Sequence, residues 1–306
     1  MKTLSIIIPH KNNLDTLAKL IPTLLVNEGF EVIIIDDHSD SSTKESLYKS
    51  YAEHPQIKLL ENTTDIFSAG KARNIGLKVA TGDWITFVDA DDIVLDNFLQ
   101  EFQKIQNYKE DIIFFRPKIE KSLLTSSRLD KLFNKYFESP TNENLWILKL
   151  QFVAPWSKFL KRSFIEENKI CFDEVKKNND VMFSKKTAIK AKNVAVLDCS
   201  FYFYDFSSTS LTKKKDLASY YSNVDVNTRS IRYQADNFST QELLKINPEV
   251  FYLSYRMILQ GLKNYKNIKV LIETLKIFKK NNLFKLKFFN PYLAVIGYKK
   301  SRELFY

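Results

Sequence analysis

The chain has 306 residues, of which 44% are hydrophobic and 27% charged, as is ordinary for a soluble globular protein. The two cysteines form no ligand pattern and there are only three histidines, which argues against a zinc site. The first ten residues, "MKTLSIIIPH", contain too short an apolar run for a signal peptide, and no apolar stretch approaches bilayer length, so a cytoplasmic location is expected.

The net charge of +10 is unevenly distributed. Residues 261–306 contain 11 Lys/Arg and 2 Asp/Glu, whereas the rest of the chain contains 35 Lys/Arg and 34 Asp/Glu. The basic character therefore belongs to the C-terminal part and needs its own explanation.

Strands and helices are expected to alternate through the first 92 residues. Continuous apolar runs predict buried strands, and apolar residues at helical spacing predict helices. Caps at Ser41 and Ser42 are expected to open the second helix, and Gly82 to end the third. The predicted strands are 4–9, 30–37, 57–62 and 84–92, and the predicted helices are 14–26, 41–53 and 68–82. This alternation predicts an α/β fold, with a mostly parallel sheet covered by helices on both faces.

Polar clusters follow three of these strands. They read "PHKNN" from residue 9, "DDHSDSS" from residue 36 and "DADD" from residue 89. Because ligands of open α/β sheets bind beyond the carboxyl ends of the strands, the three clusters are expected to converge on one site.

The remaining chain is less regular. Residues 111–117 predict a further strand, 122–150 a polar and mostly helical stretch, and 152–198 a mixture of short strands and helices. From about residue 213 the pattern is helical. We therefore predict a domain over 1–212 and a helical, basic region over 213–306.

The carboxylates after the strands have two interpretations each. Asp89 and Asp91, with Asp92 beside them, have the spacing and oxygen chemistry for one Mn²⁺ or Mg²⁺, although a solvated turn with a helix cap is the alternative. Asp36 and Asp37 are suited to accept hydrogen bonds from a base or a ribose, unless they only cap the following loop.

Two cations begin the third predicted helix. Lys71 and Arg73 are placed to meet a phosphate or the carbonyl oxygens of a base, and an exposed basic helix face is the alternative. The glycine loops of dinucleotide-binding and P-loop proteins are missing, which disfavours a dinucleotide oxidoreductase.

Taken together, these motifs resemble the family 2 glycosyltransferases of GT-A fold. The resemblance rests on "SIIIPHKNN", "EVIIIDDHSDSST", "ARNIGLKVATGDWITFVDADD" and "APWSKFLKRSFIEENKICFDE…NNDVMF". It covers roughly residues 1–212 in the family's order, and it is nearest to the bacterial members that build capsule, lipopolysaccharide or other surface glycans.

The resemblance implies a donor side. Pro9 would border the nucleobase, and Asp36 or Asp37 would contact the uracil or ribose. Arg73 would lie by the nucleotide. Asp89 and Asp91 would bind the metal that bridges the diphosphate, with Asp91 as the direct ligand, and Asp92 would approach the donor sugar.

The resemblance also implies an acceptor side. Asp180 matches the inverting base of the family's Glu-Asp pair, whereas Asn179 replaces its acidic neighbour. Trp156 and Lys158 match the family's Trp-x-Lys. The implied activity is an inverting, metal-dependent transfer from a nucleotide-sugar, most readily a UDP-sugar, to a glycan or lipid-linked glycan in bacterial surface polysaccharide synthesis. The alternative is a non-catalytic nucleotide-binding partner protein, to which Asn179 points.

The basic C-terminal region has several interpretations. Lysines interleaved with Leu, Ile and Phe suit peripheral contact with an anionic membrane, and they equally suit a helical subdomain that packs on the catalytic domain. Nucleic acid binding is not expected, because no binding motif is present. A homodimer through these helices stays open.

Overall fold

The computed structural model describes residues 3–119, 124–204, 216–285 and 290–305. They form two compact units, Met1–Asp130 with Ala154–Ser210 and Lys131–Val153 with Leu211–Tyr306. Residues 131–153, which the sequence-based division counted within 1–212, thus group with the C-terminal helices.

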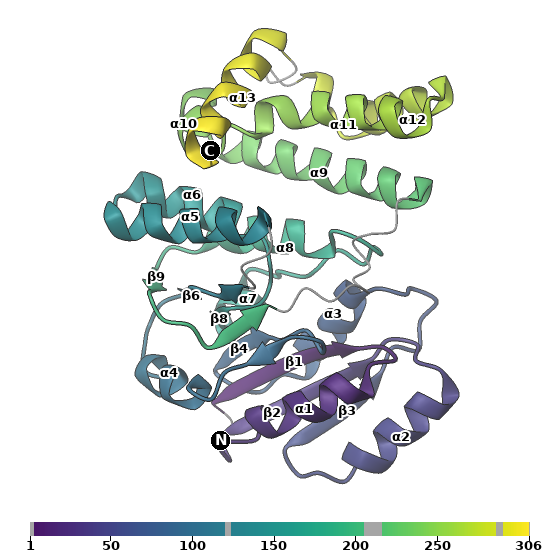
Figure 1. Cartoon of the computed structure of the whole chain (residues 1–306), viewed down its shortest axis with the longest axis vertical. Coiled ribbons are helices and arrows are strands. Elements are labelled where there is room, and N and C mark those ends of the chain that lie inside the picture. Colours follow the sequence, from purple (N-terminus) through teal and green to yellow (C-terminus); the bar gives the residue numbers. More distant parts are fainter. Residues whose placement is uncertain (1–2, 120–123, 205–215, 286–289, 306) are drawn as a thin grey trace. The chain divides into compact units, whose positions relative to one another are not determined.

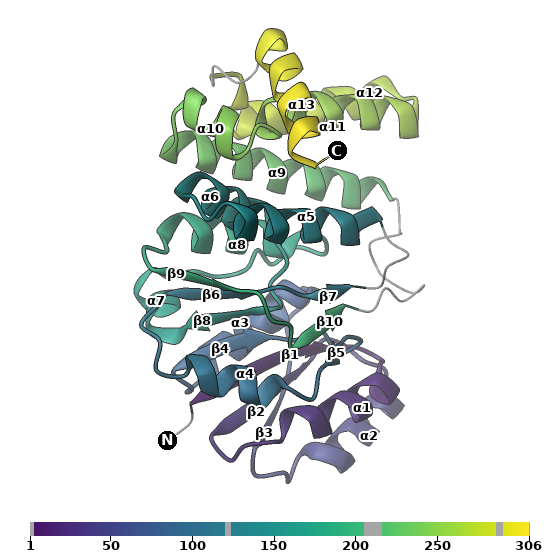
Figure 2. The ribbon, with the colours of Figure 1, turned by 60° about the vertical axis from the view of Figure 1, so that its left-hand side comes forward.

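The first unit is built on a seven-stranded sheet in the order β3-β2-β1-β4-β8-β6-β9 (Figure 1, Figure 2). Its strands are β1 (Leu4–His10), β2 (Phe30–Asp36), β3 (Ile57–Glu61), β4 (Trp84–Phe87), β6 (Ile112–Phe115), β8 (Lys158–Lys161) and β9 (Val194–Leu197). The first four are parallel, whereas β8 is antiparallel to both of its neighbours. The predicted fold class, a mostly parallel sheet with helices around it, is confirmed.

Helices and a small sheet complete the described part of this unit. The helices are α1 (Leu14–Leu24), α2 (Ser41–Tyr51), α3 (Ala69–Val79), α4 (Phe98–Ile105), α7 (Arg162–Glu167) and α8 (Asn179–Lys190). The small sheet has the order β5 (Ile93–Val94), β10 (Tyr202–Tyr204) and β7 (Lys118–Ile119). Helix α3 packs against β1 and β2, with Gly76 next to Ile7 and Ile35.

Two predicted helix ends were wrong. Asp40, not Ser41 or Ser42, caps α2, because its side chain accepts a hydrogen bond of 2.8 Å from the Thr43 amide. Helix α3 already ends at Val79, since Ala80 is extended. Gly82 instead lies against the backbone of β1, where a Cβ would come within 2.6 Å of the Ser5 nitrogen.

A buried carboxylate joins β2 to the amino end of β4. Glu31 is 2% exposed and accepts hydrogen bonds from the Ser5 hydroxyl at 2.5 Å and from the Thr81 amide at 2.6 Å, with Lys58 at 2.7 Å. Burial alone would raise the pKa of Glu31, but the bonds from Lys58, Ser5 and Thr81 lower it to about 2. Glu31 therefore holds the turn between α3 and β4 as an anion.

Glu31→Gln is expected to lower the free energy of unfolding at pH 7 by about 3 kcal/mol. This figure follows from the difference between the pKa of Glu31 in the folded chain, about 2, and its value of 4.5 in the unfolded chain. Because the pKa of Glu31 is lower in the folded chain than in the unfolded chain, the stabilisation is complete at pH values above 4.5. It is lost as the pH falls from 4.5 towards about 2. Urea unfolding across this range is expected to show the gap between wild type and variant closing in acid. The exposed Glu53→Gln is the control, and a gap that persists unchanged to pH about 2 would contradict the assignment.

The second unit is helical, as predicted for the C-terminal region. Its helices are α5 (Leu124–Glu138), within which the boundary between the units falls, α6 (Asn142–Gln151), α9 (Leu217–Asn237), α10 (Thr240–Ile246), α11 (Val250–Tyr265), α12 (Ile268–Lys280) and α13 (Pro291–Phe305), with a 3₁₀ turn at Leu283–Lys285. Helix α11 packs against α9, α12 and α13. The buried Tyr220 hydroxyl donates to the Met257 carbonyl at 2.9 Å and contacts the Thr274 hydroxyl at 3.0 Å, which joins α9, α11 and α12. Within the described ranges, every helix is too short or too polar to cross a membrane.

Candidate functional site

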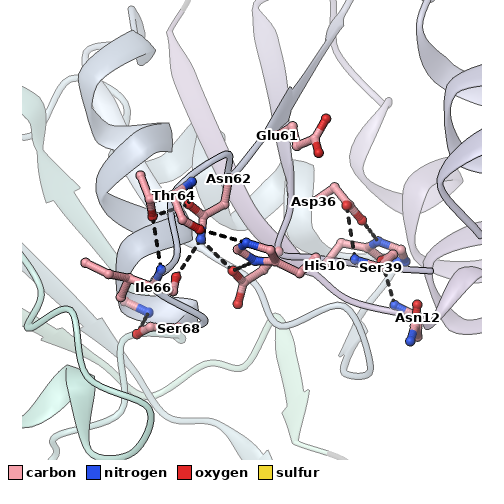
Figure 3. A network of polar contacts seen from close by, with 12 residues as sticks. His10, Asn12, Asp36, Ser39, Glu61, Asn62, Thr64, Ile66 and Ser68 are labelled. Atoms are coloured by element: carbon pink, nitrogen blue, oxygen red, sulfur yellow. Dashed lines mark hydrogen bonds and ion pairs between the residues drawn. The ribbon is translucent and has the colours of Figure 1, made fainter. Parts of the chain in front are cut away.

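The loops that follow β1 and β2 are tied to each other by hydrogen bonds. The Asn12 amide donates to the Ser39 hydroxyl at 2.9 Å, and the Asp40 amide donates to the Asn12 side chain at 2.8 Å (Figure 3). Asn12 and His38 have positive φ angles of 50° and 64°, a conformation that lets both loops turn sharply. These ties fix the edge of the sheet at which the polar clusters were expected to meet.

Asp36 is fully buried at this edge. Its carboxylate lies 3.4 Å from His10 Nδ1 and accepts a hydrogen bond of 3.2 Å from the Ser39 amide. Burial acts to raise the pKa of Asp36, but the bonds from His10 and Ser39 lower it below its usual range. Pro9, next to His10 in β1, is partly exposed. Asp36 therefore sets the shape of the loop, and it is poorly exposed for direct contact with a base.

Asp37 belongs to a second part of the same network. It accepts a hydrogen bond of 2.7 Å from the Asn62 side chain and lies 3.1 Å from His38 Nδ1. Asn62 also donates to the Ile66 carbonyl at 2.8 Å, so the loop after β3 joins the other two (Figure 3). The Phe67 ring, half of it exposed, lies 4.0 Å from the His38 ring.

Arg73 connects two of the predicted parts of the site. Its Nη2 lies 2.5 Å from an Asp89 carboxylate oxygen, and its Nη1 donates to the Asn179 side chain at 3.0 Å. The residue is only 5% exposed, and its Nε has no hydrogen-bond partner among the described residues. Buried donors are nearly always satisfied, so this N–H is an exception within the site.

Helix α3 holds the segment that precedes α8. The Asn74 side chain bonds the Phe172 backbone in both directions, at 3.0 and 2.8 Å, and the Ser68 hydroxyl donates to the Val175 carbonyl at 2.6 Å. Gly70 permits this approach, since a Cβ there would lie 2.2 Å from the Asp173 carbonyl and 2.7 Å from Asn179 Cβ. The start of α8 is thereby fixed beside Arg73.

The three carboxylates after β4 have different surroundings. Asp89 is ion-paired with Arg73, and Asp92 is buried and accepts a hydrogen bond from the Tyr202 hydroxyl. Burial and the adjacent Asp92 raise the pKa of Tyr202, so its hydroxyl keeps the proton that it donates. Asp91 is partly exposed. The Arg73 guanidinium and the Tyr202 hydroxyl thus reduce the cost of clustering these carboxylates.

A divalent ion fits this arrangement only together with a ligand. Among the described residues, no group of three or more His, Cys, Asp or Glu is placed to hold an ion unaided. Magnesium that accompanies phosphates takes one or two carboxylates and completes its shell with phosphate oxygens and water. The carboxylates of Asp89 and Asp91 match that requirement.

Asp180 lies in the first turn of α8, next to Asn179. Burial raises the pKa of Asp180, Asp89 acts in the same direction, and Arg73 and Lys158 oppose them. Lys158 in β8 is buried, with its Nζ 5.2 Å from the centre of the Phe114 ring. Burial and the neighbouring Lys185 lower the pKa of Lys158, and with the opposing effect of Asp180 the pKa is about 7. Asp180 therefore lies within electrostatic range of Arg73 and Lys158, both of which are buried.

The other predicted residues are also located. Trp156 is buried and its ring stacks on Tyr202 and Tyr204, each with ring centres 5.2 Å apart. Lys71 forms an ion pair of 3.1 Å with Glu174, so it engages the segment before α8. Trp156 thus contacts the tyrosine that holds Asp92, Lys158 lies within electrostatic range of Asp180, and Lys71 is paired with Glu174 of the same chain.

Sequence reasoning did not single out Asn62, Tyr202 or Lys185. Asn62 follows β3 just as Asp37 follows β2, so the rule about strand ends could have identified it. Tyr202 opens a Tyr-x-Tyr pattern in the sequence, whereas no pattern marks Lys185, which reaches the site only through the fold.

Comparison with known proteins gives a consistent picture. The family model described as "Glycosyl transferase family 2" matches residues 5–168. The chain is 27% identical to the poly(ribitol-phosphate) beta-glucosyltransferase of Bacillus spizizenii, over 66% of this chain and 32% of that protein. It is also 27% identical to the poly(ribitol-phosphate) beta-N-acetylglucosaminyltransferase TarP of Staphylococcus aureus, over 89% of this chain and 85% of that protein.

A solved structure shares the fold. Residues 1–349 of S. aureus TarS, crystallised in complex with UDP-GlcNAc, superpose with a TM-score of 0.60 at 19% identity, covering 92% of each chain. The chain spans about a third of the length of the first curated relatives that it matches. The resemblance inferred from the motifs is confirmed at the level of family and fold.

Proposed function

Because this chain belongs to glycosyl transferase family 2, we propose that it transfers a sugar from a UDP-sugar to a hydroxyl of a bacterial cell-surface glycopolymer, with inversion at the anomeric carbon. The observation that carries the proposal is the position of Arg73. One guanidinium joins Asp89 of the donor side to Asn179 beside the candidate base, and its buried Nε has no partner among the described residues.

The donor would lie along the carboxyl ends of the strands. The ties among the loops after β1, β2 and β3 support a preformed nucleoside site bordered by Pro9 and by the loops that Asp36 and Asp37 hold. The diphosphate would then approach Arg73 and the carboxylates after β4. Mn²⁺ or Mg²⁺, held by Asp91 and Asp89, would neutralise the charge of the leaving diphosphate. Asp92, fixed by Tyr202, would border the donor sugar.

Asp180 would take the proton of the acceptor hydroxyl. Burial raises its pKa above that of an ordinary aspartate, which favours proton acceptance, while Arg73 and Lys158 keep the anion accessible. Trp156, Lys158 and Asn179 would border the acceptor. The relatives named for poly(ribitol-phosphate) support a phosphate-containing polyol or glycan chain as the acceptor class.

Thermal unfolding with UDP tests the donor site. UDP at about 100 times its dissociation constant is expected to stabilise the wild type by about 2.7 kcal/mol in the presence of Mn²⁺, and less with EDTA. Asp91→Ala is expected to lose the manganese-dependent part. Asp96→Ala, which removes an exposed carboxylate of the following turn, is the matched control.

Sugar transfer separates the two functional hypotheses. An enzyme is expected to release UDP from UDP-glucose or UDP-GlcNAc when a polyol-phosphate or glycan acceptor is supplied. The alternative, a non-catalytic nucleotide-binding partner protein, would show the same UDP-dependent stabilisation and no transfer. If neither UDP nor another nucleotide stabilised the chain, the donor site itself would be wrong.

A further inference from the structure

Helix α12 exposes apolar residues that its own packing leaves uncovered. Val270 and Phe278 are buried, whereas Ile268 is 65% and Ile272 is 46% exposed. At about 100° per residue, Ile268 and Ile272 lie on one side of the helix and the buried residues on the other. Because Ile268 and Ile272 are four residues apart, they form one small apolar strip on the outward face of the helix.

The outward face of α12 is also basic. Lys269, Lys276, Lys279 and Lys280 are all exposed there. Lys276 pairs with Glu273 at 2.7 Å and Lys280 approaches Asp225 at 3.9 Å, so α12 keeps a net positive charge. Lysine stems pack beside apolar side chains while their ammonium groups reach outward, which makes this face both apolar and cationic.

Helix α13 repeats the arrangement. Ala294, Gly297 and Ser301 form its buried side. Tyr292 is 72% exposed, Val295 and Tyr298 are at least half exposed, and Lys299 and Lys300 are exposed as well. Two helices of the same unit therefore present aliphatic, tyrosyl and lysyl side chains to the outside.

We propose that the outward faces of α12 and α13 dock the protein on an anionic membrane surface. The lysines would meet lipid phosphates, the aliphatic side chains would enter the boundary of the acyl chains, and the tyrosines would lie among the headgroups. The proposal concerns the second unit alone and does not depend on the proposed chemistry.

Two other occupants suit this surface less well. A second copy of the chain would bring lysines against lysines, because residues 261–306 contain 11 basic and 2 acidic residues. A polyol-phosphate chain would neutralise the lysines but offers no apolar surface to Ile268, Ile272 or Val295. An anionic bilayer is complementary to both the charge and the aliphatic side chains.

Sedimentation of the full chain with vesicles tests the proposal. The wild type is expected to bind phosphatidylcholine vesicles containing phosphatidylglycerol at low ionic strength, but not pure phosphatidylcholine vesicles. Binding is expected to weaken at about 1 M salt, where the screening length falls to about 3 Å. The triple variant Lys269→Gln, Lys276→Gln, Lys279→Gln is expected to bind about 100-fold more weakly.

Two further variants keep the test specific. Lys49→Gln, Lys109→Gln, Lys190→Gln removes the same charge from exposed positions of the first unit and is expected to bind as the wild type does. Ile268→Gln with Ile272→Gln is expected to weaken vesicle binding without altering the charge. Absence of binding to anionic vesicles would overturn the proposal. An isoleucine variant that binds vesicles as the wild type does would also overturn the proposal, because the face would then be a site for polyanions. An isoleucine variant that changes only the oligomeric state would overturn it as well, because the face would then be an interface between copies of the chain.

Discussion

Asp180→Asn is expected to lower the rate of sugar transfer by about 10²–10⁴-fold, the usual contribution of a positioned general base. Asparagine has nearly the same shape, so α8 and its contacts with α3 should persist, but it cannot accept the proton of the acceptor hydroxyl. Because Asp180 is proposed to act on the acceptor, the affinity for UDP is expected to change by less than about twofold. The loss should therefore appear in kcat.

Single-turnover transfer and UDP binding, measured on the same preparations, check this expectation. Asp83→Asn is the matched control, because Asp83 is an exposed carboxylate of the same unit at the amino end of β4. Full activity of Asp180→Asn would remove Asp180 from the mechanism and direct attention to the other carboxylates of the cluster. Equal losses of UDP affinity and of rate would instead make Asp180 part of the donor site.

The fold was largely predictable because its signals are local. β1 and β2 are buried runs of Ile, Leu and Val, and such runs specify parallel strands covered on both faces. The antiparallel β8 could not be read from the sequence, because "KFLK" has only four residues and its pairing depends on β4 and β6, far away in the chain. The cap of α2 was misplaced by one residue, since Asp40, Ser41 and Ser42 are all good capping residues and only the backbone selects among them.

The site was predictable where it follows the strands. Asp36 and Asp37 lie at the carboxyl end of β2, and Asp89 lies just beyond that of β4, a parallel strand on the other side of β1. What the sequence does not show is how each carboxylate is used within the protein, since Asp36 holds a loop and Asp92 is fixed by Tyr202. The link from Arg73 to Asn179 joins residues 106 positions apart, and it depends on the approach that Gly70 permits.

Arg73→Met is expected to weaken UDP binding by at least about 100-fold, as is usual when one partner of a buried, hydrogen-bonded charge pair is removed. Methionine keeps the apolar stem beside Phe172, whose ring centre lies 5.4 Å from the guanidinium, but leaves Asp89 without its cation. The uncompensated carboxylate would then repel a diphosphate. The start of α8 would also lose its tie to α3 through Asn179, so transfer is expected to fall further than binding.

Arg73→Lys isolates the geometry from the charge, because an ammonium group cannot serve both Asp89 and Asn179 in the planar manner of guanidinium. It is expected to retain more UDP affinity than Arg73→Met and still to lose about tenfold in rate or more. Lys71→Met is the matched comparison on the same helix. Its ion pair with Glu174 lies nearer the surface, so its loss is expected to change UDP affinity by less than about fivefold.

Isothermal titration with UDP, beside melting curves of the unliganded variants, distinguishes a binding defect from a loss of stability. The expected order of affinity is wild type, then Lys71→Met, then Arg73→Lys, then Arg73→Met. If Arg73→Met bound UDP as the wild type does, Arg73 would only connect parts of the protein and would not contact the nucleotide. The donor would then have to be placed by the loops after β1, β2 and β3 alone. If Lys71→Met proved the weaker binder, Lys71 would leave Glu174 when the nucleotide enters, and the segment before α8 would be the part of the site that moves.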